Sequence, residues 1–237
     1  MSEPTKTPFE ALRARLDADE SSRSSLQDRE YCSIASKVPG WSRLNHYLFF
    51  RSMVEATDIQ CVLIVGVYHG RDICFLLDAR NKFAEFHHLA IHGVDKFNDT
   101  ECADWLPTAK GKTWEENQYG PPPTIKAAAE NICPHLRRKG EVKLIQQPDE
   151  DYLATTENKF DLIYLDSSHD YETVARQLVQ VRRLCAGAST IIAGDDFNDE
   201  GTFGVKKAVT EAFGAVATLG GLIWFTDAAH FVPAIKW

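Results

Sequence analysis

The sequence lacks any long hydrophobic run. No apolar stretch approaches the roughly 20 residues that a membrane-spanning helix needs, and residues 1–12 lack the apolar core of a signal peptide. We therefore expect no membrane partner, and the scattered cysteines described below indicate a reducing cytoplasm. An excess of positive charge is also missing, because 34 acidic residues against 26 basic ones give a net charge of −8. Nucleic acid is then an unfavourable main partner, since binding its phosphates needs clustered lysine and arginine.

Closely spaced cysteines are absent as well. The six cysteines are scattered, no close pair suits zinc, and the three in apolar segments are most simply buried free thiols (Cys61, Cys74 and Cys185). The G-x-S-x-G elbow of serine hydrolases is missing. Ser167 and Ser168 are therefore interpreted as hydrogen-bonding loop residues rather than nucleophiles.

Apolar runs alternate with amphipathic segments along most of the chain. Buried strands are predicted over 61–65, 89–94, 142–145, 160–165 and 190–193, and helices over 71–82, 125–136, 173–184 and 205–213. Two last strands, 215–219 and 222–226, meet at Gly220-Gly221 and predict an antiparallel hairpin. Strand–helix–strand crossovers imply parallel strands covered on both faces. We expect an α/β fold with a Rossmann-like, doubly wound, seven-stranded sheet.

Two further segments flank or interrupt this pattern. Residues 1–56 carry helical patterns over 8–16 and 41–56, and we expect a helical cap there, followed by the main domain over 57–237. The apolar helix over 41–56 could pair with a second copy of the chain to form a homo-oligomer. Residues 98–123 are irregular, with aromatics among Gly and Pro, and are interpreted as a lid insertion.

A glycine-containing turn follows the first strand. Its sequence, V-G-V-Y-H-G, supplies Gly66 and Gly70, which let backbone N–H groups approach a ligand at a helix N-terminus. It is not the G-x-G-x-x-G of dinucleotide enzymes, because only two glycines are present. Asp95 ends the next strand, where a carboxylate can accept both hydroxyls of a ribose. In the competing interpretation, the two glycines serve only the geometry of the turn, and Asp95 is a solvated loop residue or a helix cap.

The most specific pattern is a pair of acidic loops. Asp166 follows the strand over 160–165, and Asp195 and Asp196 follow the strand over 190–193. Adjacent strands lie roughly 4.8 Å apart, so these carboxylates could converge on one hard cation such as Mg²⁺. Alternatively, Asp196 caps the next segment and Asp195 faces water. His169, with an ordinary pKa of roughly 6.5, could serve as a general base there or be merely structural.

Together these motifs resemble the class I S-adenosylmethionine-dependent methyltransferases. The matching pieces, in family order over about 33–213, are VLIVGVYHGRDICFLL, HGVDKF, VKLIQQPDEDYL, FDLIYLDSSHDYETV and IIAGDDF. More narrowly, they resemble the macrocin-, mycinose- and novobiose-type sugar O-methyltransferases. The resemblance implies the strand order 3-2-1-4-5-7-6 and S-adenosylmethionine with Mg²⁺ or a similar divalent cation as cofactors. It also implies a small hydroxylated acceptor, such as a sugar or natural-product intermediate.

The same resemblance implies roles for individual residues. The methionine part of the cofactor would lie against one turn, the ribose at the second strand and the adenine after the third. The implied cofactor-binding residues are Gly66, Tyr68, His69, Gly70, Asp95, Lys96, Gln147, Asp149 and Asp166. The implied metal ligands are Asp166, Asp195 and Asp196, and the implied catalytic residues are His169, as general base, and Asp166. Ser168 stands where novobiose-type enzymes have a catalytic aspartate, which leaves His169 as the base.

Three other functions compete with a metal-dependent O-methyltransferase. The first is a metal-independent N- or C-methyltransferase of the same fold. The second is a nicotinamide-dependent dehydrogenase, disfavoured by the missing third glycine. The third is a non-catalytic protein that uses the domain as a scaffold.

Overall fold

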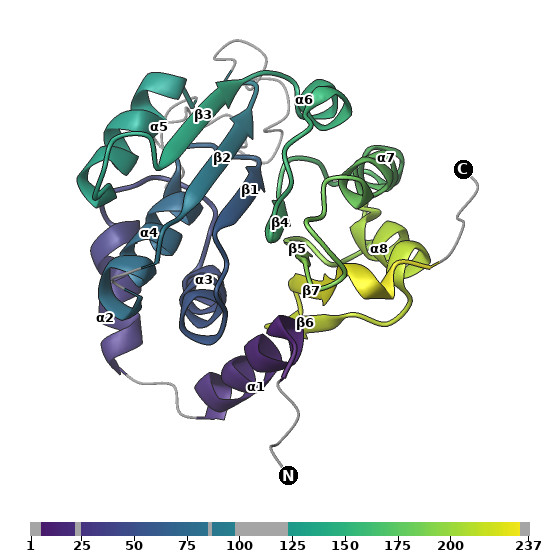
Figure 1. The fold of residues 1–237 in the computed structure, drawn as a ribbon, viewed down its shortest axis with the longest axis horizontal. Coiled ribbons are helices and arrows are strands. Elements are labelled where there is room, and N and C mark those ends of the chain that lie inside the picture. The colour runs from purple at the N-terminus through teal and green to yellow at the C-terminus, as the bar shows by residue number, and fades with distance from the viewer. Residues whose placement is uncertain (1–5, 22–24, 85–86, 98–122, 233–237) are drawn as a thin grey trace.

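A seven-stranded sheet forms the centre of the molecule. The computed structural model describes residues 6–21, 25–84, 87–97 and 123–232. The strands are β1 (Cys61–Val65), β2 (Ala90–Asp95), β3 (Val142–Gln146), β4 (Leu162–Leu165), β5 (Ile191–Gly194), β6 (Ala217–Leu219) and β7 (Ile223–Asp227). Their order is β3-β2-β1-β4-β5-β7-β6; the first five run parallel, and β7 is antiparallel to both neighbours (Figure 1). The expected fold is confirmed.

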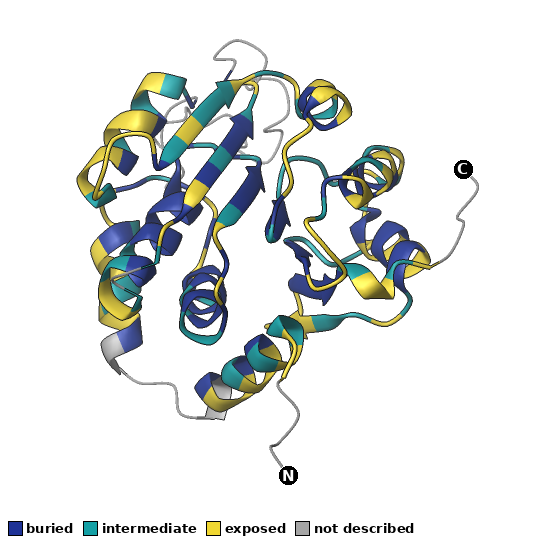
Figure 2. Cartoon of the chain, viewed as in Figure 1, coloured by how far each residue is buried: buried dark blue, intermediate teal, exposed yellow. Residues whose placement is uncertain are grey.

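Helices cover both faces of this sheet. They are α1 (Pro8–Ser21), α2 (Ser25–Ala35), α3 (Leu44–Ala56), α4 (Arg71–Phe83), α5 (Ile125–Ile132), α6 (Asp149–Thr155), α7 (Tyr171–Arg182) and α8 (Val205–Phe213), with short 3₁₀ turns η2 (Cys133–His135) and η3 (Ala228–His230). Figure 1 shows α2 to α5 on one side of the sheet and α6 to α8 on the other. The buried apolar residues accordingly form two clusters, one on each face, and the central strands are almost wholly buried (Figure 2).

The N-terminal segment differs in detail from the expectation. Helix α1 extends to Ser21, and α2 was not predicted, because the first half of its sequence, SLQDREYCSIA, is almost entirely polar. Tyr31 of α2 nevertheless packs against Phe75 of α4, with ring centroids 5.8 Å apart. Helix α3 begins at Leu44, three residues later than expected, because Arg43 is extended (φ −108°, ψ −174°). Phe49 and Phe50 of α3 contact Tyr164 of β4, so this helix belongs to the same core as the sheet.

Several other expectations concern parts of this architecture. The five cysteines in the described residues are free thiols; Cys74 is buried, whereas Cys61 and Cys185 are only half-buried. Within the same residues, every helix is too short or too polar to span a bilayer. Residues 98–122, which hold nearly all of the expected lid, lie outside the described residues. The division between 1–56 and 57–237 remains a proposal.

A buried ion pair joins α4 to the start of β3. Both terminal nitrogens of the Arg80 guanidinium contact the Glu141 carboxylate, at 2.5 and 3.1 Å, and both side chains are at most 2% exposed. The carboxylate also accepts the backbone N–H groups of Arg137 and Arg138. Burial alone would raise the pKa of Glu141, but the hydrogen bonds from Arg80 and these backbone groups lower it to about 2.

We therefore predict that Glu141→Gln destabilises the protein by about 3–5 kcal/mol at neutral pH, because Arg80 is left buried without a counter-charge. The depressed pKa gives stability that is present above the unfolded value of about 4.3 and lost as pH falls through the folded one. The difference in free energy of unfolding between wild type and variant, measured with urea, should thus shrink below about pH 4. Glu130→Gln, which removes an exposed pair with Lys126, is the control and should change stability by under about 0.5 kcal/mol. A small effect of Glu141→Gln at pH 7 would contradict the prediction.

Candidate active site

The turn between β1 and α4 has a left-handed backbone and is bonded to the neighbouring strand β2. Gly66, Tyr68 and Gly70 have φ of 91°, 52° and 85°, in the left-handed region that favours glycine. The N–H of Gly66 donates to Val94 at 2.9 Å. A Cβ on Gly66 would lie 2.0 Å from the backbone oxygen of Asp166. The glycine is thus required where the end of β1 lies against the chain that leaves the neighbouring strand β4, and not only for ligand approach.

Asp95, at the end of β2, holds the same turn. Its Oδ2 accepts the N–H groups of Val67 and Tyr68 at 2.9 and 2.8 Å, and its Oδ1 accepts the N–H of Phe97 at 2.9 Å. A carboxylate offers about four acceptor positions, and here three are used by the backbone. At least one position therefore remains for a ribose hydroxyl, and the residues fit a nucleoside ligand at Asp95.

The other expected cofactor residues lie along the same edge of the sheet. His69 is buried in the turn, Lys96 is exposed after Asp95, and the N–H of Gln147 donates to the Asp95 carbonyl at 3.0 Å. Asp149 begins α6, and its Oδ2 accepts from Ser167 at 2.5 Å and from the buried Gln177 at 2.6 Å. Ser167 is therefore a hydrogen-bonding loop residue, as expected. Its bond ties the loop after β4 to the loop after β3.

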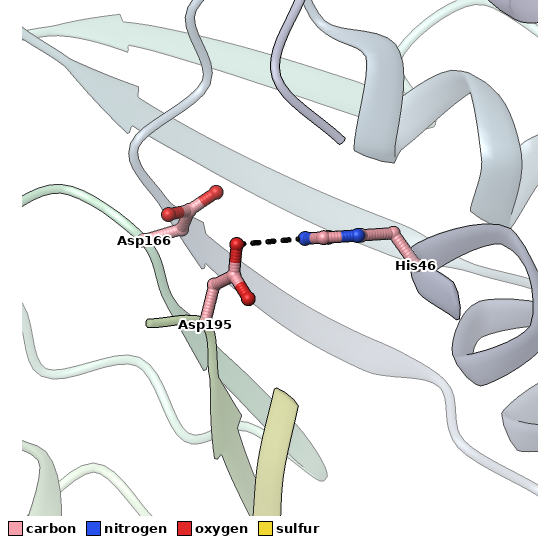
Figure 3. Close-up of side chains that lie close together, drawn as sticks. All are labelled: His46, Asp166 and Asp195. Carbon is pink, nitrogen blue, oxygen red and sulfur yellow. Dashed lines mark hydrogen bonds and ion pairs between the residues drawn. The ribbon is translucent and has the colours of Figure 1, made fainter. Parts of the chain in front are cut away.

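Two groups of metal-binding side chains meet at Asp166. One contains His46, Asp166 and Asp195, and the other contains Asp166, His169 and Asp196; within each, the candidate ligand atoms lie within 4.8 Å of one another. Figure 3 shows the first group, with Asp166 and Asp195 side by side and His46 reaching in from α3. The three expected aspartates do not form one group by themselves, because Asp195 and Asp196 fall in different groups.

The backbone after β5 explains how both of its aspartates come to lie beside Asp166. Consecutive residues of an extended strand point to opposite sides. Asp196 has φ of 56°, an uncommon left-handed conformation for a residue with a side chain. This conformation ends the alternation, so Asp195 meets His46 at 3.0 Å while Asp196 meets His169 at 2.8 Å.

The electrostatics of this cluster favour a bound cation. Partial burial, together with the charges of Asp195 and Asp72, raises the pKa of Asp166 well above its usual range. Burial also opposes ionisation of Asp195, but the hydrogen bond from His46 lowers the pKa of that carboxyl. The Oδ1 atom of Asp195 is buried and has no hydrogen-bond partner among the described residues. An acceptor oxygen without a donor, beside crowded carboxylates, fits a hard divalent cation.

The sequence did not point to two members of this site. His46 is 149 positions from Asp195, so only the folded chain brings the two together. The sole local signal is a histidine in the first turn of a helix. Asp72, in the first turn of α4, is buried, and burial raises its pKa.

The family of the chain follows from comparison with known proteins. A profile described as a methyltransferase domain matches residues 63–197, more than half of the chain. The chain therefore belongs to this methyltransferase family, and the expected enzyme class, an S-adenosylmethionine-dependent methyltransferase, is confirmed. None of the curated proteins matches the sequence.

Solved structures of methyltransferases share the fold. The O-methyltransferase NovP is 12% identical and aligns over 78% of this chain and 79% of its own, with a TM-score of 0.58. The calicheamicin methyltransferase CalS11 is 15% identical over 93% and 91%, with a TM-score of 0.55. An O-methyltransferase from Bacillus cereus in complex with SAH is 13% identical over 90% and 97%, with a TM-score of 0.52. At these identities the similarity is one of fold.

The close approach at Gly66 gives a testable prediction. We expect Gly66→Ala to destabilise the protein by roughly 2–4 kcal/mol and to weaken binding of S-adenosylhomocysteine, because the new methyl group displaces the Asp166 backbone. Gly140→Ala is the matched control: its φ is 86°, but a Cβ there meets nothing within 4 Å, so only about 1 kcal/mol is expected. Urea unfolding and calorimetric titration measure the two effects. Equal costs for both variants would show that no close contact exists at Gly66.

Proposed function

We propose that this protein is a divalent-cation-dependent O-methyltransferase of the macrocin-, mycinose- and novobiose-type group. Its acceptor would be a small hydroxylated molecule, a sugar or a natural-product intermediate. The observation that carries the proposal is the pair of carboxylate–histidine groups that share Asp166 beside the turn held by Asp95. CalS11, which has the same fold, is described as a TDP-rhamnose 3′-O-methyltransferase of calicheamicin biosynthesis, and this supports a sugar acceptor.

The proposed cofactor contacts follow the edge of the sheet. The turn around Gly66 and Gly70 would face the methionine part of S-adenosylmethionine, and Asp95 would accept one ribose hydroxyl. The segment from Gln147 to Asp149 would lie near the adenine. S-adenosylmethionine supplies a methyl group that is already electrophilic, so the protein's main tasks are to align the acceptor oxygen and to remove its proton.

The acidic cluster and His169 would remove the proton from the acceptor hydroxyl. Asp166, Asp195 and Asp196 would hold the cation, with Asp195 and Asp196 drawn together from their separate groups, and the bound cation would lower the pKa of a nearby acceptor hydroxyl. His169 Nε2 lies 2.8 Å from Asp196, so its N–H faces that carboxylate and Nδ1 is the nitrogen left to take the proton. Asp196 then stabilises the imidazolium that forms. Partial burial limits competing water at these charges.

Removal of the cation or of one ligand tests this proposal. We predict that exhaustive chelation, or Asp195→Asn, lowers methyl transfer from labelled S-adenosylmethionine to a panel of nucleotide sugars and phenols by about 100-fold or more. Asp195→Asn should also abolish binding of Mn²⁺, used as the probe ion, while S-adenosylhomocysteine still binds. His169→Gln should retain Mn²⁺ binding but lose turnover.

Asp58→Asn, at an aspartate that is 96% exposed, is the matched control. It should leave methyl transfer, Mn²⁺ binding and S-adenosylhomocysteine binding unchanged. Full activity after chelation would instead contradict the cation dependence and favour the metal-independent alternative of the same fold. Cofactor binding without transfer to any acceptor would support the scaffold function.

A further inference from the structure

We propose that His46 is a positioning residue that orients Asp195 toward the cation and is not itself a cation ligand. This inference rests on the proposed function, because it concerns the same acidic cluster. It assigns part of the site to α3, a helix of the N-terminal segment that precedes the domain matched by the family profile.

Both nitrogens of the His46 ring have defined neighbours. The side chain is only 5% exposed. Nδ1 lies 3.0 Å from the backbone nitrogen of Arg43, and Nε2 lies 3.0 Å from Oδ2 of Asp195. A backbone N–H can only donate, so Nδ1 must offer its lone pair and the ring proton must sit on Nε2. The start of helix α3 thereby sets the tautomer of the histidine.

This tautomer separates the two roles that a histidine could have here. Nε2 carries the proton and donates it to Asp195, so it has no lone pair for a cation. Ligation through Nε2 would move the proton to Nδ1, where it would face the N–H of Arg43, and two donors would then oppose each other. His46 therefore contributes a hydrogen bond to the site, and the carboxylates contribute the ligand atoms.

The hydrogen bond leaves Asp195 with two unequal oxygens. Oδ2 is held by His46, whereas Oδ1 is buried and has no partner among the described residues. Tethering one oxygen fixes the plane of the carboxylate, so the bond from His46 sets how both oxygens of Asp195 are presented beside Asp166. Hydrogen bonds to ligating side chains commonly change metal affinity by about 10–100-fold when they are removed.

The position of His46 is itself fixed by the core. Phe49 and Phe50, one turn further along α3, pack against Tyr164 of β4, the strand that leads into Asp166. The helix and the strand therefore belong to one packed core, which aligns the donor with the acidic loops.

Two isosteric substitutions separate the contacts of His46. His46→Gln places an amide nitrogen near the Nε2 position and keeps a donor for Asp195. His46→Asn places an amide oxygen near the Nδ1 position, which keeps the acceptor for Arg43 but cannot reach Asp195. With Mn²⁺ as the probe, we expect a Kd within about threefold of wild type for His46→Gln and about 10–100-fold weaker for His46→Asn. S-adenosylhomocysteine affinity should be unchanged in both.

A histidine–aspartate pair at the opposite edge of the sheet provides the control. His230 Nδ1 lies 2.7 Å from Asp227, which pairs with the first residue of β5, and His230→Gln should leave Mn²⁺ affinity unchanged. Wild-type affinity in His46→Asn, or equal losses in both His46 variants, would overturn the positioning role. No Mn²⁺ binding by the wild-type protein would instead overturn the proposed cation dependence, and this inference with it.

A measurement on the wild-type protein does not depend on how well the variants fold. Nitrogen-15 spectra of the histidine rings report which nitrogen carries the proton, and His46→Gln identifies the signal of His46. We expect the proton on Nε2 both before and after Mg²⁺ is added. A proton on Nδ1, or its movement there with Mg²⁺, would show that His46 is a ligand and would overturn the inference.

Discussion

The parallel pairing of β4 with β5 is the constraint on which the site depends. Leu165 is in register with Gly194, and the N–H of Asp195 donates to the Leu165 carbonyl at 3.3 Å. The next residue of each strand is an aspartate, so the sheet holds Asp166 and Asp195 at about the spacing of neighbouring strands, roughly 4.8 Å. No flexible loop has to close to bring these carboxylates together.

Such an arrangement costs free energy unless the charges are balanced. Carboxylates that are partly withdrawn from water and face one another resist ionisation, as the raised pKa of Asp166 shows. The protein offsets part of this cost with a histidine on each side: His46 contacts Asp195 and His169 contacts Asp196. A cation between them would offset the remainder, and this is the physical reason for the cation that we propose.

Local patterns in the sequence predicted the sheet and the place of the site. Apolar runs that end in Asp95, Asp166 and Asp195-Asp196 identify strands whose carboxyl ends share one edge. Long-range contacts were not predictable in this way. Three contacts join segments that are neighbours only in the folded chain. They are the hydrogen bond between His46 and Asp195, the hydrogen bonds from the β1–α4 turn to Asp95, and the close approach of Gly66 to the Asp166 backbone. Helix α2 was missed because packing, rather than its own amphipathicity, stabilises it.

Anomalous diffraction from crystals grown with Mn²⁺ and S-adenosylhomocysteine tests the central claim most directly. The account predicts one strong peak in contact with oxygens of Asp166, Asp195 and Asp196, beside the bound cofactor, with His46 outside the ligand shell. A peak elsewhere, or a cofactor bound with no ion at these strand ends, would contradict it.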